Sequence, residues 1–177
     1  MTAQQTTSTT TDYRIHPQTH VGHVHLRVAN LERSIAFYRD LLGFTITYDM
    51  RTEPKPRKLA FLSASHAAGH YHHHVALAEF PGVTPPTTQQ AGLFHIAFLY
   101  PSRRELARAL RRILDQGYPI DSCHDYGVGE AVNLRDPDGI PLELYYDRGD
   151  DQLRMFNQRI DAAIILAALE NKPAADD

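Results

Sequence analysis

The chain has 177 residues, of which 42% are hydrophobic, and a formal net charge of −3; these values suit one globular domain and exclude the strongly basic surface of a nucleic-acid binder. The single cysteine, Cys123, excludes an internal disulfide and a thiolate cluster for structural zinc, so we expect a reduced, cytoplasmic setting. No stretch approaches the roughly 18 apolar residues that cross a bilayer, so a membrane is not an expected partner.

Two copies of one pattern follow a polar start. Residues 1–20 are rich in Thr and Gln and lack the features of a secretion signal, so we expect a disordered tail there. The segments HVHLRVANLERSIAFYRDLLGF, from His23, and HIAFLYPSRRELARALRRILDQGY, from His95, each begin with an alternating strand and continue into a helix that stops at Gly-aromatic. Asn30 is the expected N-cap of the first helix, and Ser102 with Glu105 forms a capping box for the second.

Three strand-like runs follow each helix, so the repeated unit is predicted to be β-α-β-β-β. The runs are FTITYDM, KLAFLSA and HHHVALAEF in the first module, about residues 21–80, and PIDSC, EAVNLRD and PLELYYD in the second, about residues 93–147. The predicted fold class is α+β, with residues 21–148 forming two βαβββ modules and an incomplete barrel around a metal-binding cleft. In RDPDGIP, Pro137 and Gly139 suit a hairpin turn.

Residues 149–177 are expected to form a C-terminal extension with a short helix in IDAAIILAALE. The apolar face of this helix is expected to pack on the domain or on a second subunit, which makes a homodimer one of the open arrangements. No basic face points to a membrane surface.

The duplication places three good metal ligands at matching positions. His23 and His95 open the first strand of each module, and Glu143 lies on the last strand of the second. Two imidazoles and one carboxylate that leave other positions open form the facial triad suited to non-haem Fe(II), or to Mn(II). The alternative is that these are ordinary polar residues at strand ends.

Five of the eleven histidines fall between positions 66 and 74, and the repeat singles out one of them. His23 and His74 are 51 positions apart (74 − 23), and His95 and Glu143 are 48 apart (143 − 95), so His74 holds the place in the first module that Glu143 holds in the second. Strand parity predicts that His74 shares a face with His72 and that His73 points the other way. By the same rule His25 shares the face of His23 and is a candidate for the pocket border, while His66 and His70 are assigned to a loop.

On these residues the chain resembles the vicinal oxygen chelate superfamily, which includes glyoxalases, bleomycin-resistance proteins and extradiol dioxygenases. The resemblance covers roughly residues 20–148 and is carried by GHVHLRVANLERSIAFYRDLLGF, YHHHVAL, GLFHIAF and DPDGIPLELYYDR, which are most similar to short catechol 2,3-dioxygenases. It implies paired βαβββ modules and a metal triad of His23, His95 and Glu143.

The resemblance also implies roles for residues around the metal. His74 corresponds to the acid-base histidine, a role that suits imidazole because its unperturbed pKa is about 6.5. His124 corresponds to a second histidine of the catalytic site. The tyrosine that bonds the substrate oxygen should lie ten residues before the carboxylate ligand, and this chain has Asn133 there, so Tyr126 is the candidate for bringing a phenol into the pocket.

The predicted function is therefore an Fe(II)-dependent extradiol dioxygenase that acts on a small aromatic diol and O2. One alternative is a glyoxalase-like metal-dependent isomerase or lyase, which gains if His74 coordinates the metal as a fourth ligand. A third is a non-enzymatic protein that sequesters a ligand, which the joint presence of the three metal ligands disfavours. Catalysis by Cys123 beside His124 is a minor possibility, since a lone cysteine near a histidine is usually incidental.

Overall fold

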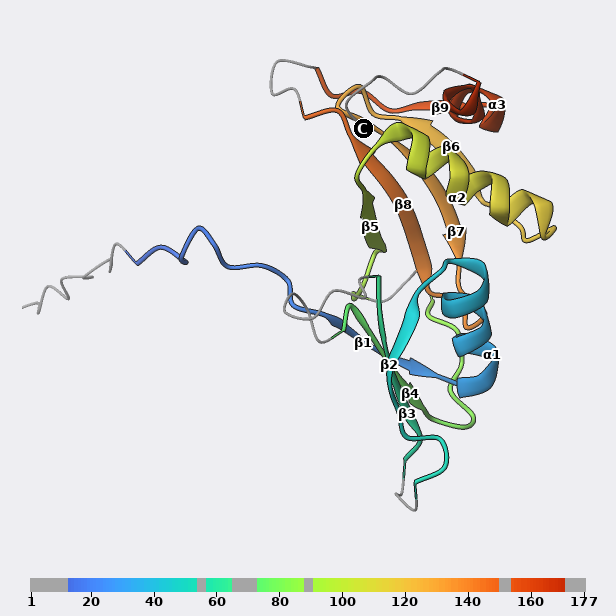
Figure 1. The fold of residues 1–177 in the computed structure, drawn as a ribbon. Helices are drawn as coiled ribbons and strands as arrows, with labels where there is room; N and C mark the ends of the chain where they lie inside the picture. The colour runs from blue at the N-terminus through green and yellow to red at the C-terminus, as the bar shows by residue number, and fades with distance from the viewer. Residues whose placement is uncertain (1–12, 54–56, 65–72, 88–90, 150–153, 171–177) are drawn as a thin grey trace, which may run out of the picture.

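The computed structural model describes residues 13–53, 57–64, 73–87, 91–149 and 154–170. Within them, two mixed sheets are present and no closed barrel forms (Figure 1). The first sheet has the order β1-β4-β3-β2, and the second has the order β5-β8-β7-β6-β9. In both sheets the first strand pairs in parallel with the last strand of its module, β1 with β4 and β5 with β8. The predicted pair of βαβββ modules is confirmed.

The first module follows the predicted element order. Its strands are β1 (Val24–Val28), β2 (Thr45–Asp49), β3 (Leu59–Ser63) and β4 (Val75–Glu79), and its helix α1 (Leu31–Ile35) continues as a π-helical segment, Ala36–Leu41. Asn30 caps the helix as predicted, because its side chain accepts a hydrogen bond from the Arg33 N–H. Gly43 ends it with a φ of +87°, a backbone region that favours glycine.

The second module repeats this order and adds one strand. It contains β5 (Ile96–Tyr100), α2 (Arg103–Asp115), β6 (Ser122–Asp125), β7 (Gly129–Arg135) and β8 (Pro141–Asp147). Ser102 caps α2 by accepting from the Glu105 N–H, as the capping box predicts. The added strand, β9 (Gln158–Ile160), pairs antiparallel with β6 and lies in the segment that the sequence pattern left without a strand.

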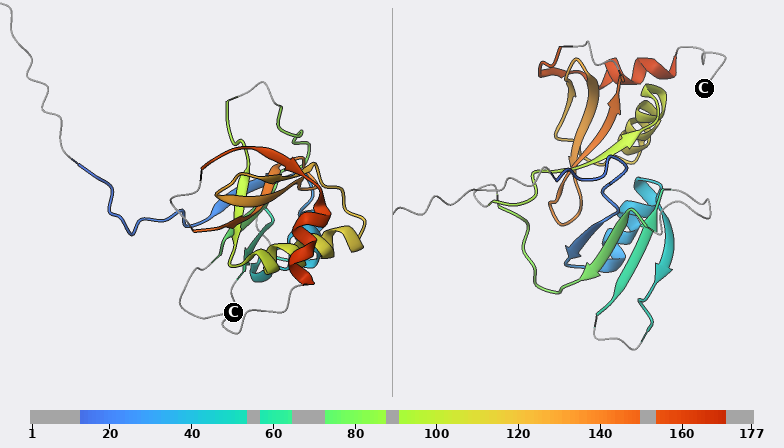
Figure 2. Two further views of the ribbon diagram at one scale, coloured as in Figure 1. Left: turned by 90° about the horizontal axis from the view of Figure 1, so that it is seen from above. Right: turned by 90° about the vertical axis from the view of Figure 1, so that its left-hand side faces the viewer.

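The C-terminal helix packs on its own chain. α3 (Ala162–Leu166) continues as a 3-10 turn, Ala167–Leu169, and lies beside α2 (Figure 2). Arg103 donates to the Ile164 carbonyl at 2.6 Å, and Ile165 is fully buried. Of the two expected positions for this apolar face, the structure therefore has the one on the domain.

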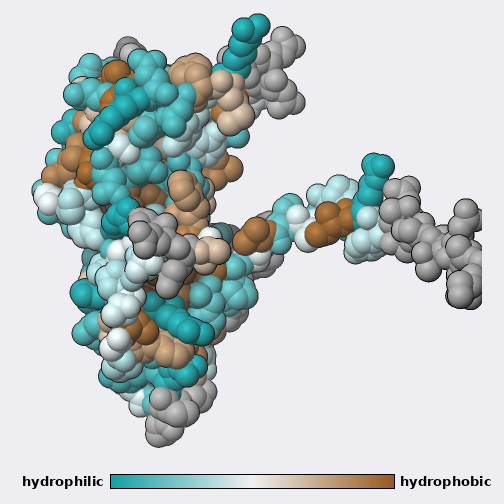
Figure 3. Space-filling model, turned by 180° about the vertical axis from the view of Figure 1, so that it is seen from behind, coloured by the Kyte–Doolittle hydropathy of each residue, from teal (hydrophilic) through white to brown (hydrophobic). Residues whose placement is uncertain are grey.

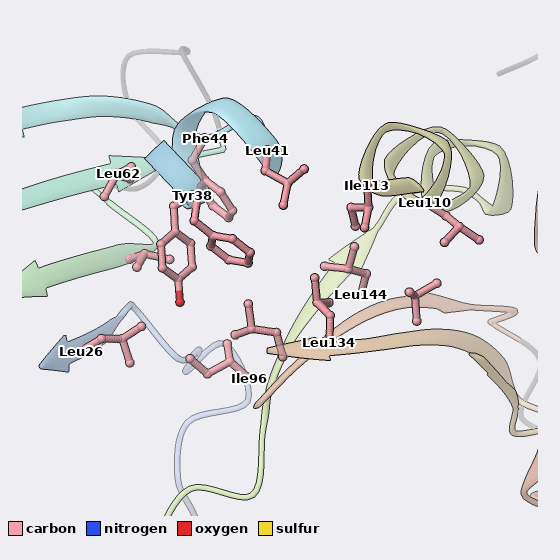
Figure 4. Packing of buried hydrophobic residues seen from close by; sticks show 14 of the residues in the cluster. Leu26, Tyr38, Leu41, Phe44, Leu62, Ile96, Leu110, Ile113, Leu134 and Leu144 are labelled. Atoms are coloured by element: carbon pink, nitrogen blue, oxygen red, sulfur yellow. The ribbon is translucent and has the colours of Figure 1, made fainter. Parts of the chain in front are cut away.

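One hydrophobic core joins the two modules. Side chains from the α1 segment and from α2 point toward a shared region between the modules, as the labelled side chains in Figure 4 show. Two hydrogen bonds lie beside this core. The Tyr38 hydroxyl donates to Asp136 Oδ2 at 3.1 Å, and the Ser34 hydroxyl donates to Asp138 Oδ2 at 3.1 Å. The β7–β8 turn is thereby fastened to the first helix.

The surface is mixed in character, with hydrophilic side chains over much of the face in Figure 3 and hydrophobic ones in scattered patches. No helix within the described ranges has the length and apolar content needed to cross a membrane. Residues 13–20 are exposed and form no helix or strand, while residues 1–12 of the predicted tail lie outside the described part.

Candidate active site

His95 and Glu143 come together on neighbouring parallel strands. His95 immediately precedes β5, Glu143 lies within β8, and the register pairs Ala97 with Glu143. His95 Nε2 lies 3.6 Å from Glu143 Oε2. The Glu143 side chain is 8% exposed and that of His95 is 33% exposed, so the carboxylate is buried beside an imidazole that solvent reaches. Two of the three predicted metal ligands are therefore adjacent.

Tyr126 brings a phenol to this pair. Its hydroxyl donates a hydrogen bond to Glu143 Oε1 at 3.1 Å. Asn133 is the register partner of Glu143 on β7. Burial, followed by the charge of Glu143, raises the pKa of Tyr126, so the phenol stays protonated as a donor near neutral pH.

The ring of His124 packs against the ring of Tyr126. The two rings stack with centroids 5.7 Å apart and planes 21° apart. His124 Nδ1 lies 2.6 Å from Asn157 Oδ1, and His124 Nε2 lies 3.1 Å from Ser122 Oγ. Both ring nitrogens therefore have protein partners, and one of these comes from the C-terminal extension.

An ion-pair network supports the turn that carries Tyr126. Arg148 donates to Asp125 through its two terminal guanidinium nitrogens, at 2.8 and 3.1 Å, and to the Gly127 carbonyl at 2.6 Å. This guanidinium holds the pKa of Asp125 below its usual range. Arg148 also bonds the buried Glu130 at 3.0 Å, so it links the turn to β7.

His73 and His74, the described members of the histidine cluster in the first module, contact different parts of it. The His73 ring lies 4.4 Å from that of His23 and stacks on Phe61, also at 4.4 Å. His74 turns to the end of β3, where its Nδ1 lies 3.1 Å from Ser63 Oγ and accepts from the Ala64 N–H at 3.2 Å. His73 and His74 thus contact different residues, and the predicted shared face of His72 and His74 stays a prediction. His66, His70 and His72 lie outside the described residues.

Two separate pockets border the predicted residues. One, of about 480 Å³, is lined by His95, Asn133 and Ser122 together with the exposed Phe94 and other residues. The other, of about 420 Å³, is lined by His25, Arg27, Arg57, Leu59, Ala78 and Phe80. His25 thus borders a different pocket from the one beside His95.

Burial makes Cys123 a poor nucleophile. It is 3% exposed, and burial raises the pKa of its thiol to about 11, so the reactive thiolate is scarce at neutral pH.

The donors only partly fit the predicted metal. Imidazole and carboxylate at 3.6 Å form a suitable pair for Fe(II) or Mn(II). His23 packs instead against His73, and the described part of the chain gathers no group of three or more His, Cys, Asp or Glu side chains that could hold a metal ion. Within this chain the complete triad is therefore not assembled.

The sequence named Tyr126 as the candidate source of a phenol but did not give its partner in the site. Asn133 holds the position where the resemblance places the phenol, and the structure has the phenol of Tyr126 bonded to Glu143. His73, Ser122 and Asn157 were not anticipated. Of these, only Ser122 had a usable signal, since it shares strand parity with the predicted His124.

Comparison with known proteins agrees with the fold and the motifs. Residues 20–144 match the Glyoxalase/Bleomycin resistance protein/Dioxygenase superfamily. The chain is 37% identical over 135 residues to a catechol-2,3-dioxygenase of Bacillus subtilis (strain 168), a match that covers 76% of this chain and 44% of that protein. It is 29% identical over 129 residues to a manganese-dependent 2,3-dihydroxybiphenyl 1,2-dioxygenase of Geobacillus genomosp. 3, covering 71% and 36%.

The chain thus spans less than half the length of these two relatives. Among solved structures, it is similar to a glyoxylase/bleomycin resistance protein/dioxygenase domain from Frankia sp. EAN1pec, with a TM-score of 0.61, 22% identity and coverage of 73% of this chain and 98% of that one. That likeness supports the fold. Together with the match over residues 20–144, it shows that the chain belongs to the glyoxalase/bleomycin resistance protein/dioxygenase superfamily.

Proposed function

We propose that this chain is a metal-dependent extradiol dioxygenase that opens the ring of a catechol-like diol with O2. The observation that carries the proposal is the hydrogen bond from the Tyr126 phenol to Glu143 Oε1, beside His95. The names of the Bacillus and Geobacillus relatives, both diol dioxygenases, support the same reaction class.

Fe(II) is the proposed metal and Mn(II) the alternative, which the name of the Geobacillus relative supports. The proposed ligands are His95, Glu143 and His23. His23 does not lie with the other two ligands in the described part of the chain. We therefore include a homodimer in the proposal, and its test measures metal binding and association on the same samples.

Tyr126 and Asn133 are proposed to orient Glu143 and to face the diol. The phenol bonds only Oε1 of the carboxylate, while Oε2 faces His95. Asn133 also lines the pocket that opens beside His95, where an amide can donate to a diol oxygen. His25 lines another pocket and is retained only as a secondary binding candidate.

His74 is proposed to handle protons. Since the Ala64 N–H donates to its Nδ1, that nitrogen is unprotonated, and a neutral ring carries its proton on Nε2. The Nε2–H is the group proposed to donate to a substrate oxygen, and a second proton would enter at Nδ1, where the Ala64 N–H now donates. His124 is proposed to assist the reaction through its ring, which stacks on Tyr126.

The test is oxygen uptake by the whole chain reconstituted anaerobically with Fe(II) and, separately, with Mn(II). A panel of catechols should give a coloured ring-opened product and consume one O2 for each diol. Metal content and oligomeric state are measured on the same samples. Bound metal with no oxygen uptake over the whole panel would remove the dioxygenase.

A glyoxalase-like isomerase or lyase is the second candidate, and its distinguishing feature is a fourth ligand. If His74 coordinates the metal, His74→Ala loses metal as well as activity, and the isomerase becomes the better assignment. Failure to bind any divalent metal would favour a ligand-sequestering protein.

A further inference from the structure

The C-terminal segment Arg154–Ile160 lies against the turn that carries Tyr126. The Phe156 N–H donates to the Tyr126 carbonyl at 3.0 Å, and the β9 register continues this contact by pairing Gln158 with Asp125 and Arg159 with His124. The segment therefore follows the backbone on both sides of Tyr126.

Gly127 shows how close the approach is. Its φ is +77°, and a Cβ there would lie 2.1 Å from the Arg154 carbonyl oxygen and 2.7 Å from the Phe156 ring. Only glycine combines this backbone with this contact. The turn is therefore enclosed by the segment on one side and by Arg148, which bonds the Gly127 carbonyl, on the other.

Asn157 is the side chain of this segment that reaches the site residues. Its Oδ1 lies 2.6 Å from His124 Nδ1, and an amide oxygen only accepts hydrogen bonds. Nδ1 must then carry the proton, which leaves Nε2 to accept from the Ser122 hydroxyl at 3.1 Å. This arrangement selects one tautomer of His124 and fixes the plane of its ring, which stacks on Tyr126.

We propose that Asn157 is a positioning residue of the active site: it holds His124 in the Nδ1–H tautomer, and the stacked ring keeps the Tyr126 phenol on Glu143. The C-terminal extension is then part of the catalytic apparatus. The catalytic half of this inference rests on the proposed dioxygenase function, whereas the tautomer of His124 does not.

The first experiment reads the tautomer directly in the whole, metal-free chain. Long-range ¹H–¹⁵N correlation spectra of histidine-labelled protein at pH 8 should show His124 as the Nδ1–H form, with the signal assigned by its loss in His124→Gln. Asn157→Ala should shift it toward the Nε2–H form that predominates in free histidine, and Asn157→Asp, which still offers an acceptor oxygen, should restore it. Gln158→Ala, one residue further on, is the matched control and should leave the signal unchanged.

The second experiment uses the metal-loaded protein. Asn157→Ala should lower kcat on the order of tenfold, with a smaller change in KM and unchanged metal content, and Asn157→Asp should recover most of kcat. A wild-type His124 signal in Asn157→Ala would overturn the proposal, and so would a shifted signal with wild-type kcat.

Two further outcomes are separable. If wild-type protein turns over no diol but the tautomer responds as expected, the dioxygenase function fails and the positioning contact stands.

If Asn157→Ala does not fold, Ser122→Ala probes the other ring nitrogen. It removes the donor to Nε2, and the Nδ1–H form should persist because Asn157 selects it. Loss of that form in folded Ser122→Ala would overturn the assignment to Asn157.

Discussion

Tyr126 brings a phenol to Glu143 from a strand end that the resemblance does not use for this purpose. The phenol expected ten residues before the carboxylate is absent, since Asn133 holds that position on β7. Tyr126 reaches the carboxylate of Glu143 from the end of β6. A phenolic donor therefore lies beside Glu143 from a different backbone position.

Removing that hydroxyl tests the replacement. We expect Tyr126→Phe to lower kcat by about ten- to a hundredfold with metal retained, because the ring stays stacked while the donor to Glu143 is lost. Steady-state kinetics with metal analysis measures this. Tyr100→Phe is the control, because it removes a hydroxyl from the end of β5 that lies away from His95. Equal losses of kcat in the two variants would contradict the assignment.

His74 and its neighbour His73 form a natural matched pair. We expect His74→Ala to keep its metal and lose diol turnover on the order of a hundredfold, because a proton-handling group is removed. His73→Ala removes the ring that packs against His23 and should leave the proton chemistry in place. Metal analysis and kcat of both variants decide; metal loss in His74→Ala would make His74 a ligand.

At the scale of elements, the β6–β7 turn depends on Arg148. The pKa of Asp125 is lowered in the folded protein, so the ion pair contributes stability above the ordinary carboxyl pKa of about 4 and loses it as pH falls through the lowered folded value. Arg148→Gln should therefore be destabilised at pH 7.

The same comparison at low pH supplies the check. As pH falls through the folded pKa of Asp125, the difference in urea midpoint between Arg148→Gln and wild type should shrink, because Asp125 is protonated in both proteins. Arg154→Gln, an exposed arginine with no ion pair among the described contacts, is the control. A difference that is constant from pH 7 to pH 3 would show that Arg148 acts through its other contacts alone.

For the whole molecule, Asp138 is one of the residues that join the modules. It lies in the β7–β8 turn, is 8% exposed, and accepts hydrogen bonds from the Ala29 N–H, from Ser34 and from Arg33 of the first module. Asp138→Ala removes the acceptor of three donors in the first module, among them the half-buried Ala29 N–H, so we expect a loss of about 1–3 kcal/mol in unfolding free energy.

Urea unfolding followed by far-UV and near-UV signals measures this loss. Asp115→Ala, at the exposed end of α2, is the control and should change little. If the modules fold as one unit, both signals should shift together. A variant that unfolds in two separate steps would show instead that Asp138 couples otherwise independent modules.

Local patterns in the sequence predicted the elements and the pair His95 and Glu143. The caps at Asn30 and Ser102, the glycine stops and the strand alternation are physical preferences of short segments, and the internal repeat transfers them from one module to the other. The duplication and the resemblance named His95 and Glu143 together as ligands, and the parallel pairing of β5 with β8 in the structure puts them side by side.

Only the tertiary structure decided the positions of Tyr126, His73, His74 and the C-terminal segment. Each of these lies where a strand begins or ends or where β9 meets β6, and there side-chain direction depends on contacts between segments far apart in sequence. His124 and Asn157 are 33 residues apart and meet only because an extra strand closes on the sheet. Alternation predicts the face of a strand on which a side chain lies but not the partner that it meets there, so these contacts came only from the tertiary structure.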